Sequence, residues 1–551
     1  MFISQPIIKL SMDKENRFKT DDLSKCIAFA LENIIRYGDT DIFPYPIERR
    51  VFKTKKDDVR ELLLGISTDF QKALINMPIE HERLLSVVGY TGFRQGTQID
   101  PLWNAYLLGL VIWIGDDIEH VRIDTDKNVV FSYRFKPNLD DFLIFDKKIG
   151  WLAFKERARE LAKDAKFVLT CDIADFYPRI YHHRLENALK RATKNTVAIC
   201  QIKKILNDIS KGVSYGLPVG GPAARLLSEL LLNQTDKLLL SKRIKYCRFV
   251  DDFCIFGNTK EEIYSYLIYL SETLSNNDGF SLQKNKTRIM SSEEFLKTSD
   301  YGDEESTGAA TKKEFIKLHI HYDPYSDTAE EDYTALRTEL NKFDIISMLS
   351  SELQKTRISE GLTRKLIKAV AYIDKSLQRP AVISILDNLT ILHPIFPTVM
   401  LLLIGIIDKL DKETREDVFQ CLREIIDKKS HLVRIPTNLA FVTRVLASDP
   451  SEETDSVLVN IFSETSSMAI KKDIILILSQ HNFDSWISDQ LKRFDTSTSW
   501  ERRALLISSY ILEDEGSAWR KRVKKRLSPF DSLILQWAGE SKSNRERIEL
   551  T

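Results

Sequence analysis

The sequence predicts an α+β domain over residues 1–298 and an all-α domain of helical repeats after it. Strand patterns alternate with helical patterns up to about residue 298, which is typical of an α+β or α/β domain. Beyond residue 331 strand patterns largely stop, and roughly a dozen amphipathic segments follow, separated by short breaks. The length of 551 residues leaves room for about two to four domains.

The composition is that of an ordinary globular protein. Hydrophobic residues make up 43%, and 80 Lys and Arg are balanced by 80 Asp and Glu. A neutral chain has no general basic field, so a nucleic acid must be held by local patches. The most apolar stretch, residues 398–407, is too short for a membrane helix, and the six cysteines contain no Cys-x-x-Cys pair. We therefore expect a cytoplasmic protein with reduced thiols and no membrane contact.

The segments before residue 150 are expected to be helices and turns, with one hairpin. Residues 25–37 predict an amphipathic helix, followed by a proline-punctuated turn at residues 41–47. Two apolar runs within residues 121–135 flank a polar stretch, and this pattern predicts a β-hairpin.

The next segment has the pattern of a small sheet. A helix over residues 151–165 leads into a strand at residues 167–171, and a second strand pair is predicted at residues 244–249 and 253–256. Residues 299–313 predict an exposed acidic loop. The helical segments beyond it predict a solenoid of helical hairpins, although no strict repeat period is visible.

Adjacent aspartates recur along the chain, so context must choose among them. Asp251 and Asp252 lie between two short apolar strands, which places both carboxylates in a tight turn with buried flanks. Asp116 and Asp117 also have apolar flanks, but no upstream strand ends in a matching aspartate. For Asp251 and Asp252 taken alone, a plain turn is an equally good interpretation.

A third carboxylate favours a metal site. The strand at residues 167–171 leads directly into Asp172, so Asp172, Asp251 and Asp252 would end separate strands of one sheet. Buried carboxylates need a cation to offset their charge. Three of them suit two divalent ions that align an attacking oxygen with a leaving phosphate oxygen.

Four segments, in this order, resemble the conserved motifs of reverse transcriptases. Motif A is resembled by Asp172-Ile-Ala-Asp-Phe-Tyr177, motif B by Gly216-Leu-Pro-Val-Gly-Gly-Pro222, motif C by Phe249-Val-Asp-Asp252, and motif D by Gly279-Phe-Ser-Leu-Gln-Lys-Asn-Lys-Thr287. The resemblance implies a fingers-like region at residues 1–150, a palm at 151–298, a linker at 299–330 and a helical-repeat domain at 331–551.

The resemblance assigns roles to individual residues of motifs A and C. Asp172, Asp251 and Asp252 would bind Mg²⁺, with Mn²⁺ as an alternative ion, and the backbone of Ile173 would add a carbonyl ligand. Tyr177 falls at the aromatic gate that excludes a ribose 2′-OH.

Four further positions would serve the nucleotide. Lys286 falls at the motif D lysine, a proton donor to the leaving pyrophosphate, with a solvated surface lysine as the alternative. Arg134 would hold the triphosphate. Val219 and Gly220 lie in the nucleotide-contacting part of motif B, where the family usually has Gln in place of Val219. Loss of that amide puts ordinary template handling in question.

Three other segments narrow the resemblance to the abortive-infection (Abi) type of defence-associated bacterial reverse transcriptases. They are Tyr37-Gly-Asp-Thr-Asp-Ile-Phe-Pro44, Phe131-Ser-Tyr-Arg-Phe135 and Gly220-Gly-Pro-Ala-Ala-Arg225. This resemblance implies antiphage defence, homo-oligomers, HEAT-like C-terminal repeats and protein-primed DNA synthesis without a template.

We therefore expect a Mg²⁺-dependent DNA polymerase, a nucleotidyltransferase that consumes deoxynucleoside triphosphates. Its product would be single-stranded DNA, free or covalently attached to the protein. One alternative is templated cDNA synthesis on a dedicated structured non-coding RNA. Another is a degenerate palm kept as an assembly scaffold, although a scaffold has no reason to keep three buried carboxylates.

Synthesis that starts without a nucleic-acid primer needs a hydroxyl from the protein. Tyr37 and Tyr45 are the candidates, because they bracket a segment with Gly and Pro that could reach across a cleft. A phenol is also easier to deprotonate than Ser or Thr. With 18 tyrosines in the chain, a packing role is the alternative for each.

Six basic residues crowd residues 520–526. A nucleic-acid contact and a solvated helix face fit this run equally well.

Overall fold

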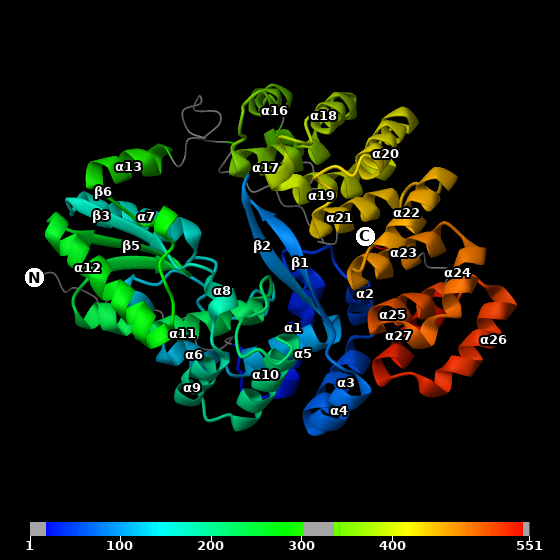
Figure 1. Ribbon diagram of the computed structural model, residues 1–551, viewed down its shortest axis with the longest axis horizontal. Helices are drawn as coiled ribbons and strands as arrows, with labels where there is room; N and C mark the ends of the chain where they lie inside the picture. Colours follow the sequence, from blue (N-terminus) through cyan, green and yellow to red (C-terminus); the bar gives the residue numbers. More distant parts are fainter. Residues whose placement is uncertain (1–17, 302–314, 316–335, 341, 544–549, 551) are drawn as a thin grey trace, which may run out of the picture.

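The computed structural model describes residues 18–301, 315, 336–340, 342–543 and 550. Figure 1 shows a part that contains a four-stranded sheet on one side and a curved array of helices on the other, with a long hairpin between them. Within the described residues, no helix is long and apolar enough to cross a membrane.

The N-terminal helices surround one central helix. They are α1 (Leu23–Tyr37), α2 (Glu48–Thr54), α3 (Lys56–Thr68), α4 (Phe70–Asn76), α5 (Pro101–Trp113) and α6 (Gly115–Val121). The predicted first helix is confirmed: Asp22 caps its N-terminus at Ser24, and Gly38 ends it with a φ of +82°. Helix α5 is apolar on every side and almost wholly buried, as expected for a core helix.

Strands β1 (His81–Val88) and β2 (Gly92–Ile99) form an antiparallel hairpin that the sequence did not predict. Its alternation of buried and exposed positions is incomplete, because parts of both faces touch other segments. In Figure 1 the hairpin lies between the sheet and the helical array.

The hairpin expected over residues 121–135 is wrong. Val121 ends helix α6, and residues Thr125–Lys127 form a single 3₁₀ turn that Asp124 caps. The second apolar run pairs elsewhere: Phe131 N donates to Arg248 O at 2.9 Å. The alternating pattern therefore reflects contact with the central sheet rather than pairing within the segment.

The four-stranded sheet confirms the predicted strands. Its members are β3 (Phe167–Asp172), β4 (Lys245–Phe249), β5 (Asp252–Gly257) and β6 (Arg288–Ser291), in the order β4-β5-β3-β6 with every neighbouring pair antiparallel. Helices α7 (Trp151–Lys163) and α13 (Ser292–Tyr301) cover one face. Helix α12 (Lys260–Thr273) covers the other.

Four more helices connect the strands. They are α8 (Phe176–Arg179), α9 (His182–Ala192), α10 (Thr196–Ile209) and α11 (Pro222–Ser241). A π turn, Leu274–Asp278, and a 3₁₀ turn, Lys284–Lys286, follow α12. The acidic loop predicted at residues 299–313 lies almost wholly outside the described residues.

The C-terminal part is helical, as predicted. Its main helices are α16 (Ile345–Leu353), α17 (Glu360–Ala369), α18 (Lys375–Asp387), α19 (Phe396–Ile406), α20 (Lys412–Asp427), α21 (Pro436–Leu446), α22 (Glu452–Glu464), α23 (Met468–Gln480), α24 (Asp484–Leu491), α25 (Ser499–Ser508), α26 (Glu513–Val523) and α27 (Pro529–Ser543). From α17 to α27 each odd-numbered helix packs on the next odd-numbered one, and α16, α18, α20 and α22 pack in a second row. The helices therefore form two layers.

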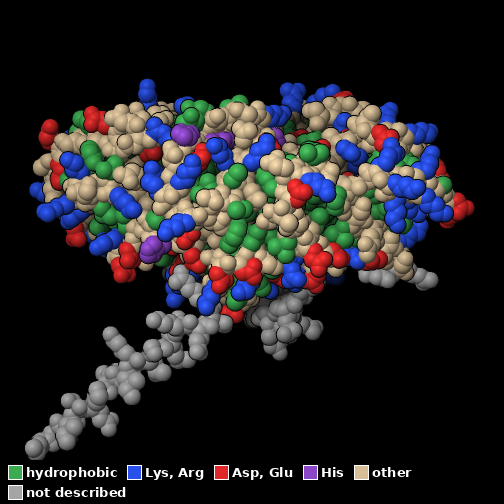
Figure 2. All heavy atoms as spheres, turned by 90° about the horizontal axis from the view of Figure 1, so that it is seen from below, with side chains coloured by type: hydrophobic (Ala, Val, Ile, Leu, Met, Phe, Trp, Pro, Cys, Tyr) green, Lys and Arg blue, Asp and Glu red, His purple; other side chains and the backbone are tan. Residues whose placement is uncertain are grey.

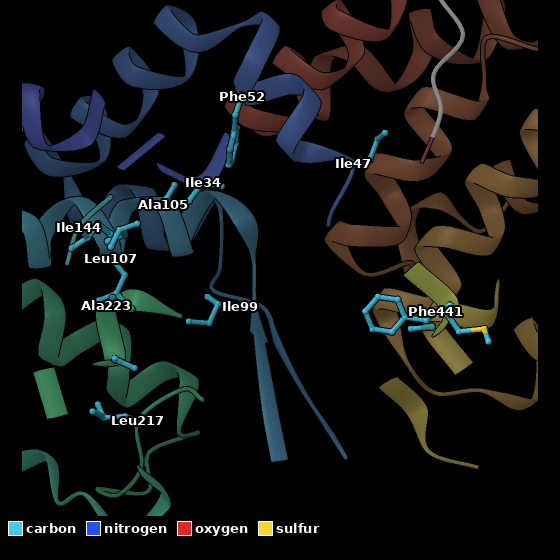
Figure 3. Packing of buried hydrophobic residues seen from close by; sticks show 14 of the residues in the cluster. Ile34, Ile47, Phe52, Ile99, Ala105, Leu107, Ile144, Leu217, Ala223 and Phe441 are labelled. Carbon is cyan, nitrogen blue, oxygen red and sulfur yellow. The ribbon is translucent and has the colours of Figure 1, made fainter. Parts of the chain in front are cut away.

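The odd-numbered layer packs against the N-terminal region. Arg503 on α25 lies 2.6 Å from Asp100 and 3.4 Å from Glu48, and Lys472 on α23 lies 3.2 Å from Glu48. All four side chains are buried. Figure 3 shows part of the apolar counterpart: Leu217, which precedes α11, and Phe441 on α21 belong to one core cluster. The two parts therefore share one hydrophobic core.

Candidate active site

Three aspartates meet at one edge of the sheet. Asp172 is the last residue of β3 and Asp252 the first of β5, and the two are direct cross-strand partners. Asp251 precedes Asp252 in the turn between β4 and β5, and its carbonyl accepts the N–H of Ile173 at 3.2 Å. The structure therefore brings together the three carboxylates that the sequence singled out.

Burial and like charge act on these carboxyl groups. Burial, followed by the charges of Asp172 and Asp252, raises the pKa of Asp251 to about 7. Burial and Asp172 raise the pKa of Asp252 to about 6. Lys286 forms an ion pair with Asp172, so this lysine lies beside the carboxylates. A site in which neighbouring negative charges raise the pKa of Asp251 and of Asp252 is one that a cation would stabilise.

Carboxylates are typical ligands of hard divalent cations such as Mg²⁺. Within the described part of the chain, no group of three or more His, Cys, Asp or Glu side chains is placed so that it could hold a metal ion. Mg²⁺ does not need three protein ligands, because it keeps several waters and binds through one or two carboxylates together with substrate phosphates. Three carboxylates at the sheet edge supply ligands of that kind.

Tyr177 lies beside this edge on the short helix α8. Its ring packs against Phe176, and its hydroxyl lies 3.4 Å from Ser228 Oγ on α11. Its carbonyl accepts the N–H of Leu217 at 3.0 Å, which ties motif A to motif B. Burial raises the pKa of the Tyr177 phenol, so the side chain stays neutral.

Motif B is covered by the segment that follows α1. The Val219 side chain packs against Ile42 and Phe43, and these contacts are apolar. Gly220 has a φ of +125°, and a Cβ there would lie 2.4 Å from Thr40 Oγ1. Only Gly fits this left-handed position under so close a neighbour.

Arg134 does not face the carboxylates. It lies 2.5 Å from Glu119 and donates to Ile123 O at 2.8 Å, with its side chain only 5% exposed. Burial lowers the pKa of its guanidinium. The structure gives no support to the triphosphate contact expected for Arg134.

The two candidate priming tyrosines both reach the surface. Tyr37 is 39% exposed and donates its hydroxyl hydrogen to Asp141 O at 2.7 Å. Tyr45 is 42% exposed, and the Arg49 guanidinium lies over its ring at 4.3 Å. Tyr45 also packs closely against Gly38.

Two residues near the site received no role from the sequence. Arg225 on α11 pairs with Asp41 at 2.6 Å, and its guanidinium lies 5.4 Å from the centre of the Tyr133 ring. Burial raises the pKa of the Tyr133 phenol, the charge of Arg225 lowers it, and the charge of Asp251 raises it. Asp41, Tyr133 and Arg225 lie in the three segments that narrow the family resemblance, but nothing in the sequence indicates that they meet.

Asp116 and Asp117 lie in the first turn of helix α6. Thr20 Oγ1 donates to Asp116 at 3.0 Å, and Asp117 accepts a hydrogen bond from Thr193.

Comparison with protein families supports the motif assignments. Residues 117–317 match the family model described as reverse transcriptase (RNA-dependent DNA polymerase). All four motif segments lie within the matched range. No curated protein matches the chain.

The solved structures that match include two telomerases of low sequence identity. Telomerase from Candida albicans aligns with 10% identity and a TM-score of 0.29, covering 76% of this chain and 70% of its own. Telomerase from Candida tropicalis aligns with 11% identity and a TM-score of 0.27, covering 75% of this chain and 72% of its own.

Proposed function

Because residues 117–317 form a reverse-transcriptase domain, whose enzyme class is RNA-directed DNA polymerase, we propose that this protein synthesises DNA at Asp172, Asp251 and Asp252. The observation that carries the proposal is the cross-strand pairing of Asp172 with Asp252, next to Asp251. Mg²⁺ held there would activate the attacking hydroxyl and offset charge on the leaving phosphate oxygens.

The neighbouring residues take the remaining roles in this proposal. Lys286, already paired with Asp172, protonates the leaving pyrophosphate. The ring of Tyr177 occupies the space of a ribose 2′-OH and selects deoxynucleotides. The Ile173 backbone and Gly220 line the nucleotide site, and the N–H of Ile173 fixes the Asp251 backbone beside it.

The finer part of the proposal is template-independent, protein-primed synthesis in antiphage defence of the abortive-infection type. Its support is that Val219 replaces the usual motif B glutamine and packs on Ile42 and Phe43. An apolar side chain there makes no hydrogen bond toward a template strand. Tyr37 and Tyr45 are exposed and remain the proposed sources of the priming hydroxyl.

The C-terminal helices are proposed to be HEAT-like repeats that drive self-association or hold single-stranded product. Two layers of helices present an extended surface suited to long partners. Figure 2 shows Lys and Arg side chains gathered at the end of the molecule where α26 lies in Figure 1. The exposed members are Lys521, Arg522, Lys524, Lys525 and Arg526. Such a patch suits a phosphate backbone.

The test is to incubate the purified protein with labelled deoxynucleotides and Mg²⁺ in the absence of nucleic acid. The proposal predicts labelled DNA that enters a denaturing gel only after protease digestion. A product that migrates as free DNA before proteolysis removes protein priming. A product that appears only with a particular RNA, and whose sequence is its complement, favours templated copying of a non-coding RNA.

A second outcome concerns the scaffold alternative. A degenerate palm would make no DNA under any of these conditions, yet would still assemble. Synthesis abolished by Asp172→Asn would exclude this alternative, because the substitution removes one negative charge and little volume.

A further inference from the structure

Val250, the residue before the two motif C aspartates, has an unusual backbone conformation. Its φ is +54°, a left-handed value that is strained for a β-branched residue. Buried side chains hold both polar groups of this residue. Its N–H donates to Ser132 Oγ at 2.9 Å, and its carbonyl accepts from Arg248 Nη1 at 2.7 Å. Ser132 and Arg248 are both 0% exposed, so water does not compete for these bonds.

Ser132 and Arg248, the two residues that hold Val250, both contact carboxylates on helix α11, which follows motif B. Arg248 Nη2 lies 3.1 Å from Glu229 and 2.6 Å from Asp236. Ser132 Oγ donates to the same Glu229 at 2.5 Å, and Arg122 pairs with it at 2.8 Å. The motif C turn is thereby tied through buried charges to the helix that follows motif B.

The charges of this network are matched. The Glu229 and Asp236 carboxylates raise the pKa of the Arg248 guanidinium, so the side chain stays charged. A buried ion pair is rigid, because moving either partner leaves an uncompensated charge in the interior. A fixed guanidinium and a fixed hydroxyl therefore leave the Val250 peptide little freedom to rotate.

The consequence concerns the next residue along the chain. Relaxing Val250 to an ordinary φ would rotate the following peptide and turn the Asp251 carboxylate away from Asp172. We propose that Ser132, Glu229 and Arg248 are positioning residues that hold Val250 left-handed and so aim Asp251 at the catalytic metal. This proposal rests on the assignment of Asp251 as a metal ligand.

The test compares two buried hydroxyl groups that each donate to a carboxylate. Ser132 donates to Glu229 on α11, and Thr235, which is itself on α11, donates to Asp278. Ser132→Ala removes the hydroxyl that contacts Val250. The matched control is Thr235→Val on α11, because Thr235 is also 0% exposed and donates to Asp278 at 3.0 Å, away from the turn. Each full-length variant is assayed for melting temperature, Mn²⁺ binding by electron paramagnetic resonance, and DNA synthesis.

Both variants are expected to melt at a lower temperature. Only Ser132→Ala should weaken Mn²⁺ binding, by about tenfold or more, as for other residues that orient metal ligands. It should lower kcat by a similar factor and leave the KM for deoxynucleotide unchanged. Arg248→Lys, which keeps the buried charge but loses the fork that reaches Val250 O, should show the same pattern and gives a second measurement if Ser132→Ala does not fold.

Asp251→Asn, measured in parallel, tests the metal assignment of Asp251 separately from the positioning role of Ser132 and Arg248. Wild-type synthesis and Mn²⁺ binding in Asp251→Asn would overturn the metal assignment and the positioning role together. An inactive Asp251→Asn, with Ser132→Ala and Arg248→Lys matching Thr235→Val in Mn²⁺ affinity and kcat, would overturn the positioning role alone.

Discussion

Asp172 and Asp252 face each other as cross-strand partners at the point where β3 ends and β5 begins. In an antiparallel pair, directly opposite residues bring their Cβ atoms within about 5.5 Å. Like charges in such a pair are destabilising unless a cation lies between or beside them. The position is therefore unfavourable for folding alone, which is typical of a site kept for chemistry.

The charge of Asp251 should make the metal-free protein less stable as the pH rises. Its folded pKa is raised to about 7, whereas an unfolded aspartate titrates near about 3.9. Between these values the folded state binds more protons, so stability falls with increasing pH across that window. In EDTA, Asp251→Asn should melt at a higher temperature than the wild type at about pH 8, and at nearly the same temperature at about pH 4.

Mg²⁺ provides the control for this experiment. At about pH 8 it should raise the melting temperature of the wild type, because a ligand that binds only the folded state stabilises it, and raise that of Asp251→Asn much less. Equal gains in both proteins would show that the ion binds elsewhere.

Tyr177→Ala should relax the choice of sugar. The Tyr177 ring packs against Phe176 and its hydroxyl lies 3.4 Å from Ser228 Oγ, and these contacts oppose movement of the ring away from a 2′-OH. Removing it should lower the preference for deoxynucleotides over ribonucleotides by about 10- to 100-fold, measured as a ratio of kcat/KM values. Tyr177→Phe should keep the preference, because the proposed exclusion is steric. A lower rate with an unchanged sugar ratio would place the gate at another residue.

Arg503→Ala should destabilise the contact between the helical array and the N-terminal region. The guanidinium is buried beside Asp100, Glu48 and Asp531. Its loss leaves buried carboxylates without their partner, which lowers the free energy of unfolding by about 3–5 kcal/mol. Denaturant unfolding measures the change. Arg526→Ala is the matched control, because its pair with Asp495 is exposed and should contribute less than about 1 kcal/mol.

The proposed self-association can be measured directly. Sedimentation of the full-length protein at micromolar concentration should show a species larger than the 63.7 kDa monomer. A monomer under these conditions would contradict obligate assembly. Replacing the exposed Lys and Arg of residues 521–526 with Glu should weaken binding of single-stranded DNA without changing the assembly state.

Local signals predicted the catalytic sheet well. The apolar run before Asp172 and the two runs around Asp251 are each short and bounded, so strands β3, β4 and β5 were expected where they lie. The hairpin predicted at residues 121–135 is wrong, because the second apolar run of this segment pairs with β4 instead of with the first run. Periodicity shows that a segment can pair, but it does not show which partner it takes.

Long-range contacts explain the remaining differences. The sequence indicated an exposed Arg134, but its side chain is buried and forms an ion pair with Glu119. Nothing near Ser132 or Glu229 in the sequence indicates that they meet at Val250. Such contacts depend on where α11 lies relative to Arg248 on β4, which a single sequence does not specify.

The most direct test of the catalytic assignment is DNA synthesis by the wild type and by Asp251→Asn. Both proteins receive labelled deoxynucleotides and Mg²⁺, once without nucleic acid and once with a primed RNA template. We expect labelled polymer from the wild type in at least one condition and none from Asp251→Asn in either, with both proteins folded by circular dichroism. Polymer from a folded Asp251→Asn at the wild-type rate would contradict this assignment.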